Sequence, residues 1–257
     1  MSDESVKPPA PLTPWDSLRR HTPARIGLER SGASLATGPL LSARLAHARA
    51  RDAVHEPLDE TRLGDELGVL GLPVVVVSSG AENRQQYLLR PDLGRRLAPG
   101  AETLLTPHAQ GDIDVVFVIT DGLSARATQS HAAPLLAAIV PLLQPDWSIG
   151  PLVILRQGRV AAGDAIAAAL HARIVVVLIG ERPGLSAPDS MGAYLTWRPR
   201  PQTTDADRNC ISNIRPEGIG TSDAAFRLVY LLREMRKRQV SGVALKDTSE
   251  RLEIGEG

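Results

Sequence analysis

Apolar runs alternate with helical patterns through the middle of the chain. Three aliphatic runs, each bounded by polar or glycine-containing loops, lie at residues 113–120, 152–155 and 174–179. Between them, residues 126–143 and 161–171 have the length and apolar content of helices, although Pro134 and Pro141 interrupt the first. Strands that alternate with helices imply right-handed crossovers, and uninterrupted apolar strands indicate a sheet covered on both faces. The pattern therefore predicts an α/β fold with a mainly parallel sheet.

A helix and a β-hairpin are predicted ahead of this core. Residues 40–55 place apolar positions at helical spacing, beside a neighbouring basic stripe formed by Arg44, His47, Arg51 and His55. That stripe is either a solvated face or a docking surface for an acidic partner or a phosphate. The β-branched run 74–79, a turn at 80–83 and a returning strand at 86–89 indicate the hairpin. A short helix should start near Pro91.

The two ends of the chain have simpler patterns. Five prolines in residues 1–26 predict an extended arm rather than a helix. Near the other end an amphipathic helix should begin at Ser222, whose side chain is suited to cap it. We therefore divide the chain into four parts. They are an arm at 1–26, an N-terminal helical part with the hairpin at 27–100, an α/β domain at 101–247 and a polar tail at 248–257.

Composition excludes several classes of protein. Lysine and arginine together number 29, as do aspartate and glutamate, so the net charge of zero argues against a general nucleic-acid binder. One cysteine and the lack of a secretory apolar segment predict a reducing compartment without disulfides. The longest apolar run, 174–180, is far too short to span a membrane. We expect neither nucleic acid nor membrane as a partner.

Candidate chemistry gathers where the three apolar strands end. Asp121-Gly122, Gln157-Gly158-Arg159 and Glu181-Arg182 follow them directly, and open α/β sheets bind ligands beyond the carboxyl ends of their strands. The polar segment 208–218, which holds the single cysteine, suits a polyfunctional ligand. Dinucleotide, P-loop, nucleophile-elbow and zinc-ligand motifs are absent, so the sequence shows no self-contained enzyme. Residues 106–111 keep the His-x-x-Gly of a base-off cobalamin motif but have Thr106 where Asp is required.

Several long strings resemble the small (light) subunit of ethanolamine ammonia-lyase. They are RRHTPARIGLERSGAS, AHARARDAVH, YLLRPDLGRRL, DVVFVITDGLSARA, GERPGLSAPDSMG and DADRNCISNIRPEG. The resemblance runs from about residue 18 to residue 247, in order. It implies a Rossmann-like α/β domain, at 101–247 in this chain, preceded by a small helical N-terminal part.

The resemblance also implies a function. Members of this family pair with a TIM-barrel large (heavy) subunit, six copies of each, and adenosylcobalamin lies between the two kinds of subunit. The enzyme converts ethanolamine to acetaldehyde and ammonia by a radical mechanism that the cofactor initiates. Ethanolamine is bound mainly by the large subunit, so we expect no catalytic residue and no metal ligand in this chain.

The family's cobalamin positions fall here on Val160, Glu181 and Cys210. Val160 would pack against the cofactor, Glu181 would accept hydrogen bonds from its amide arms or ribose, and Cys210 would give a soft contact or a weak donor. The alternatives are ordinary core for Val160, a helix-start carboxylate for Glu181 and an inert buried thiol for Cys210. Asp121 and Arg182 are further candidates because of their place at the strand ends.

Two alternatives and the cellular location complete the prediction. One alternative is a small-molecule-binding α/β module without a catalytic partner. The other is a structural subunit that does not touch cofactor. Some members of the family carry a longer leader that directs them into a bacterial microcompartment. The arm at 1–26 lacks an amphipathic helix, so we predict a cytoplasmic enzyme, with the microcompartment lumen as the alternative.

Overall fold

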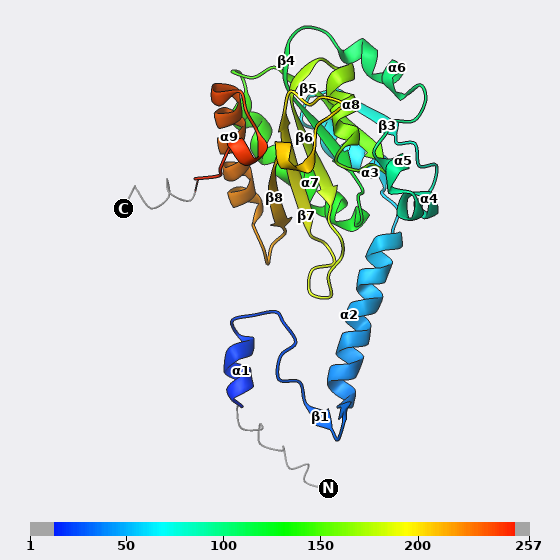
Figure 1. Cartoon of the computed structure of the whole chain (residues 1–257), viewed down its shortest axis with the longest axis vertical. Coiled ribbons are helices and arrows are strands. Elements are labelled where there is room, and N and C mark those ends of the chain that lie inside the picture. Colours follow the sequence, from blue (N-terminus) through cyan, green and yellow to red (C-terminus); the bar gives the residue numbers. More distant parts are fainter. Residues whose placement is uncertain (1–12, 250–257) are drawn as a thin grey trace, which may run out of the picture.

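The computed structural model describes residues 13–249, and a six-stranded mixed sheet lies at its centre (Figure 1). The strands are β3 (Val74–Ser78), β4 (Ile113–Thr120), β5 (Ile149–Arg156), β6 (Ala172–Gly180), β7 (Met191–Trp197) and β8 (Arg208–Ile214). Their order is β3-β5-β4-β6-β7-β8. The first four are parallel to one another, and β7 and β8 extend the sheet in antiparallel fashion. The α/β class is thus confirmed, and the sheet is mixed, with a parallel majority.

Helices cover both faces of this sheet, and two further helices lie away from it (Figure 1). In chain order the helices are α1 (Pro14–Arg19), α2 (Thr37–His55), α3 (Glu60–Gly68), α4 (Arg84–Leu89), α5 (Pro91–Gly94), α6 (Ala101–Leu105), α7 (Ala125–Leu143), α8 (Ala162–Ala169) and α9 (Thr221–Arg238), of which α1 and α2 extend away from the sheet. Alternate residues of β4 point to opposite faces: Phe117 packs in a core with α3, α7 and α9, and Val118 in one with α6 and α8. Among residues 13–249, no helix combines the length and the apolar character needed to cross a bilayer.

Helix α7 continues through both of its prolines. A proline inside a helix frees the carbonyl four residues earlier, here those of Ser130 and Ala137. Pro134, Pro141, Ser130 and Ala137 all occupy exposed positions, so water can satisfy the freed carbonyls. The buried face of the helix therefore stays uninterrupted.

The predicted β-hairpin at residues 74–89 is wrong. Strand β3 pairs in parallel with β5, and the segment expected to return as a strand is helix α4. The side chain of Asn83 explains the helix, because its Oδ1 accepts a hydrogen bond from the backbone N–H of Gln86 at 3.0 Å. β3 therefore joins the part at 27–100 to the sheet of the part at 101–247, and the division at residue 100 stays a prediction.

Predictions near the chain ends are wrong in two places. Residues 14–19 form helix α1 instead of an extended arm, because Pro14 occupies the first turn and Asp16 accepts hydrogen bonds from the backbone N–H and hydroxyl of Thr13. Helix α9 begins at Thr221 after Gly220, so Ser222 lies inside its first turn and is not the cap. Residues 1–12 of the arm and 250–257 of the tail lie outside the described residues.

A glycine at the end of β6 permits the closest approach between strand-end loops. A Cβ at Gly180 would overlap the carbonyl oxygens of Ser124 and Asp121, whereas a Cβ at Gly64 in α3 would meet nothing within 4 Å. We expect Gly180→Ala to lower the free energy of unfolding by about 1–3 kcal/mol through overpacking. Gly64→Ala should raise it by roughly 0.5–1 kcal/mol, because alanine favours the helix. Urea denaturation of both variants checks this, and an unchanged midpoint for Gly180→Ala would contradict the packing.

Candidate functional site

The carboxyl ends of β5, β4 and β6 lie side by side, as the sequence predicted. A depression of about 440 Å³ opens at this edge. Its lining includes Val160 after β5, Glu181 and Arg182 after β6, and the rings of Tyr87 from α4 and Tyr194 from β7. The structure therefore brings Val160 and Glu181 together on one surface, which we call the rim depression.

Hydrogen bonds from three elements fix the loop that carries Val160. The hydroxyl of Tyr87 donates to the Gly158 carbonyl at 3.2 Å, and the Gly158 N–H donates to Thr120 Oγ1 at 3.0 Å. The Arg159 N–H donates to the Gly94 carbonyl at 2.8 Å. Gln157, which begins the loop, has a left-handed φ of 52°. These bonds hold Val160 half-buried at the wall of the depression, partly against the core and partly open.

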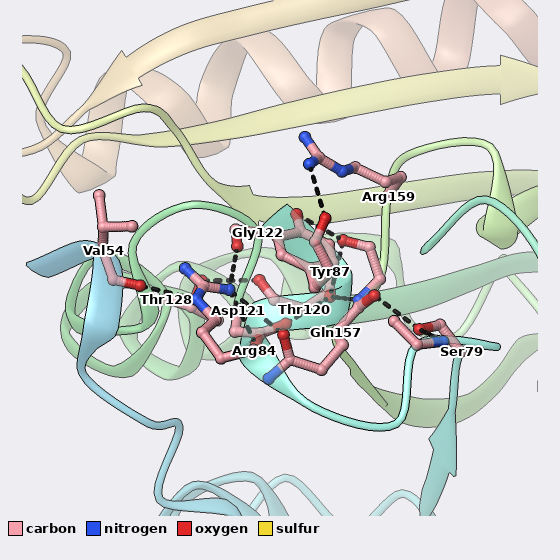
Figure 2. Close-up of polar contacts among 12 residues, drawn as sticks. Val54, Ser79, Arg84, Tyr87, Thr120, Asp121, Gly122, Thr128, Gln157 and Arg159 are labelled. Atoms are coloured by element: carbon pink, nitrogen blue, oxygen red, sulfur yellow. Dashed lines mark hydrogen bonds and ion pairs between the residues drawn. The ribbon is translucent and has the colours of Figure 1, made fainter. Parts of the chain in front are cut away.

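Two arginines pack on the ring of Tyr87 at this loop, Arg84 from α4 and Arg159 from the loop itself (Figure 2). The guanidinium of Arg84 lies 4.9 Å from the ring centroid of Tyr87, and that of Arg159 lies 4.2 Å from it. Burial raises the pKa of the fully buried Tyr87 to about 12, so its hydroxyl stays protonated and donates. The Nε of Arg159 is buried and finds no hydrogen-bond acceptor in residues 13–249. An unpaired buried donor beside an open depression marks a place where a ligand acceptor would be favourable.

Asp121 is buried behind the depression and is not part of its lining. Its carboxylate accepts a hydrogen bond from Thr120 Oγ1 at 3.2 Å and lies 3.5 Å from the Nη1 of Arg84. Burial raises the pKa of Asp121, and the nearby Arg84 opposes that rise. Burial also lowers the pKa of Arg84. Of the two secondary candidates, Arg182 therefore borders the depression and Asp121 supports it from behind.

Glu181 joins the end of β6 to the two antiparallel strands. Its backbone N–H donates to the Ser190 carbonyl at 2.9 Å, and its carboxylate accepts hydrogen bonds from the Ser190 hydroxyl and, at 3.2 Å, from the Asn213 N–H. The interpretation of Glu181 as a helix-start carboxylate is wrong, because residues 181–190 form a loop that leads into β7. A carboxylate keeps further acceptor positions beyond these two bonds, and Glu181 borders the depression.

Cys210 lies on the edge strand β8, directly opposite Tyr194. Its thiol adjoins Tyr194, which itself lines the depression. Desolvation raises the pKa of the Cys210 thiol, and the negative charge of Glu181 adds to that rise. The residue is exposed, so the interpretation as a buried thiol is wrong. A neutral thiol can give a soft contact or a weak hydrogen bond, and it is a poor nucleophile.

Part of the polar segment at 208–218, which the sequence suggested for ligand binding, stabilises the fold. The buried guanidinium of Arg208 pairs with Asp164 at 2.7 Å and donates to the Thr196 hydroxyl at 2.8 Å. Asn209 holds the C-terminal segment through a 2.7 Å hydrogen bond to the Leu245 carbonyl. The polarity of these residues therefore comes from packing β8 against its neighbours. Cys210 and Asn213 are outside the lining of the depression and contact it indirectly, through Tyr194 and Glu181.

Both tyrosines of the lining, Tyr87 and Tyr194, escaped prediction. Tyr87 was assigned to the hairpin strand, although the Asn83 cap could have identified the helix. Arg159 was noticed at the strand end without a role. Tyr194 belongs to β7, and the alternating pattern of Tyr194, Thr196 and their apolar neighbours was the available sign of that strand.

Comparison with known proteins gives a consistent result over nearly the whole chain. A family model described as ethanolamine ammonia-lyase light chain (EutC) matches residues 12–246. The ethanolamine ammonia-lyase small subunit of Ralstonia nicotianae is 51% identical over 256 residues, covering 97% of this chain and 95% of the relative. The proteins of the same description from Azotobacter vinelandii and Bradyrhizobium diazoefficiens are each 52% identical, covering 97% of this chain and 93% and 95% of the relatives.

The buried carboxyl of Asp121 should make stability depend on pH. Its pKa in the folded chain lies above the ordinary 3.8, so in the interval above 3.8 the folded chain holds a proton that the unfolded chain releases. This group's contribution to the free energy of unfolding therefore falls as pH rises through that interval. Asp121→Asn removes the dependence, so the variant should gain stability relative to the native chain as pH rises. Urea denaturation in a buffer series measures this, and a constant difference would contradict the raised pKa.

Proposed function

This chain belongs to the ethanolamine ammonia-lyase light-chain family, and we propose that it is the small subunit of an adenosylcobalamin-dependent enzyme that converts ethanolamine to acetaldehyde and ammonia by a radical mechanism. One observation carries the proposal: the family match runs from residue 12 to residue 246 and includes every strand and helix that forms the rim depression. The partner in this proposal is the large subunit, which binds ethanolamine.

The lining of the rim depression fits a cobalamin on chemical grounds. A corrin ring has apolar faces and a rim of amide side arms, so its site needs apolar contacts beside hydrogen-bonding groups. Val160 and Leu123 supply the first, and the Glu181 carboxylate, the Tyr194 hydroxyl and the unpaired Arg159 Nε supply the second. A depression of about 440 Å³ is small for a whole corrinoid, which suits one wall of a site completed by another subunit.

Each proposed cofactor residue of this chain has a distinct part in binding. Val160 packs against an apolar part of the cofactor from a loop that is fixed in place. Glu181 accepts hydrogen bonds from amide arms or a ribose hydroxyl, and Cys210 offers a neutral thiol beside Tyr194. When bound, adenosylcobalamin supplies a cobalt–carbon bond whose homolysis starts the radical chemistry. This chain binds and orients it, and contributes no residue to the substrate.

The proposal extends to assembly and location. We place six copies of this chain with six large subunits, in the cytoplasm, with the microcompartment lumen as the alternative. Light scattering of the purified complex measures the stoichiometry. A fluorescent reporter fused to residues 1–24 tests the location, because recruitment of that reporter into microcompartment shells would contradict a cytoplasmic enzyme.

Reconstitution tests the proposed activity directly. The chain is co-expressed with the large subunit of its own organism, and the complex is supplied with adenosylcobalamin and ethanolamine. Acetaldehyde, followed through a coupled alcohol dehydrogenase, should appear with the complex and not with either subunit alone. A stable complex without turnover would contradict the proposal and favour a structural or small-molecule-binding subunit.

Substitution of Glu181 tests the cofactor site. Glu181→Ala should weaken adenosylcobalamin binding to the complex about tenfold or more, as expected for loss of a charged hydrogen-bond acceptor, and should leave assembly intact. Ser190→Ala is the matched control, because it removes the hydroxyl that bonds the carboxylate but keeps the carboxylate itself. Equilibrium dialysis measures affinity, and size-exclusion chromatography measures assembly. Equal affinity in Glu181→Ala and native complexes would indicate a structural subunit that does not touch cofactor.

A further inference from the structure

One buried guanidinium joins three segments that meet beside the rim depression (Figure 2). Arg84 Nε donates to the Val54 carbonyl in the last turn of α2 at 2.6 Å. Its Nη1 donates to the Gly122 carbonyl at 2.7 Å and lies 3.4 Å from the Oε1 of Gln157. We propose that Arg84 is a positioning residue that couples helix α2 to the rim depression, so that the orientation of α2 sets cofactor affinity; this rests on the proposed function.

Helix α2 depends on few contacts for its orientation. Over Thr37–His55, Ala53 is the single buried residue, and the helix extends well away from the sheet (Figure 1). At its carboxyl end it is held by the bond from Arg84 and by an ion pair between Glu56 and Arg126 at 2.9 Å. The second tie is exposed and therefore weak, whereas the Arg84 side chain is only 16% exposed. Arg84 is thus the stronger of these two attachments.

The same guanidinium reaches the lining of the depression. Arg84 lies over one face of Tyr87, and Arg159 lies over the Tyr87 ring at 4.2 Å. Tyr87 and Arg159 both line the depression, and Val160 follows Arg159 in the chain. A displacement of Arg84 therefore changes the support of Tyr87 and, through it, the loop that carries Val160. Packed and hydrogen-bonded groups of this kind transmit displacements because they do not deform freely.

Helix α2 also adjoins the loop that begins at Glu181. Leu185, near the tip of that loop, lines a shared hollow with Arg44, His47 and Arg51 of α2. The helix thus contacts the loops that border the depression at two places, through Arg84 at the loops after β4 and β5 and through Leu185 at the loop after β6. Its exposed Leu41 and Leu45, 57% and 52% exposed, lie farther along the same helix. A displacement of the projecting part of α2 therefore moves the loops on both sides of the depression, those after β4 and β5 and that after β6.

The experiment compares three variants in the complex with the large subunit. Arg84→Met removes every polar contact of the guanidinium, and Arg84→Lys keeps the charge but cannot bond Val54 and Gly122 together. Arg126→Met is the matched control, because it releases the same end of α2 without touching the depression. Two quantities are measured: the adenosylcobalamin dissociation constant by equilibrium dialysis, and hydrogen exchange of the backbone amides at 51–55 and 157–160 without cofactor.

Coupling predicts a specific pattern. Arg84→Met should bind adenosylcobalamin about tenfold more weakly and exchange faster at both segments, since the partly buried carbonyls of Val54 and Gly122 lose a charged donor. Arg84→Lys should lie between it and the native complex. Arg126→Met should exchange faster at 51–55 alone and keep the native dissociation constant.

Three results would overturn the coupling. The first is native affinity in Arg84→Lys, which also decides the matter if Arg84→Met does not fold. The second is faster exchange at 51–55 alone in both Arg84 variants. The third is an equal loss of affinity in Arg126→Met. Failure of the proposed function can be distinguished from failure of the coupling. A native complex that binds no adenosylcobalamin contradicts the function, whereas the hydrogen-exchange comparison still tests the coupling.

Discussion

Parallel pairing of β4 with both of its neighbours is the constraint on which the rest of the structure depends. Strand β4 forms registered ladders with β5 on one side and β6 on the other, and its residues from Val115 to Thr120 are fully buried. Because parallel strands run in the same direction, their carboxyl ends must meet at one edge. The loops that carry Gln157, Gly122 and Glu181 are adjacent for this reason, although they are separated along the chain.

A chain so poor in aromatic residues concentrates two of its tyrosines at this edge. Tyr87 is buried and its ring contacts two arginines, and Tyr194 connects the depression to Cys210. A buried charge is tolerated only with hydrogen-bonding partners, and the backbone carbonyls around Arg84 supply them. The polar layer behind the depression therefore supports the loop that holds the half-buried Val160.

The antiparallel extension of the sheet gives the depression its other wall. Without β7 and β8, neither Tyr194 nor Cys210 would lie near the loop at Glu181, and the Glu181 carboxylate bonds the Asn213 N–H of β8 directly. The three proposed cofactor residues are thus positioned by two kinds of strand pairing. Val160 and Glu181 follow parallel strands, whereas Cys210 lies on an antiparallel strand. An open, one-sided site of this form is suited to a subunit that binds a large cofactor together with a partner.

The sequence by itself determined the α/β class, the three central strands and the edge at which they end, because continuous apolar runs and helical periodicity are local signals. It also identified the family, through long ordered strings. The helix at 84–89 was also a local signal, because the Asn83 side chain caps it. Only the tertiary structure decided that β7 and β8 pair in antiparallel fashion and that Arg159 packs on Tyr87. Those features depend on strand partners more than ten residues apart and on a contact between segments more than seventy residues apart, and no periodicity along the chain encodes them.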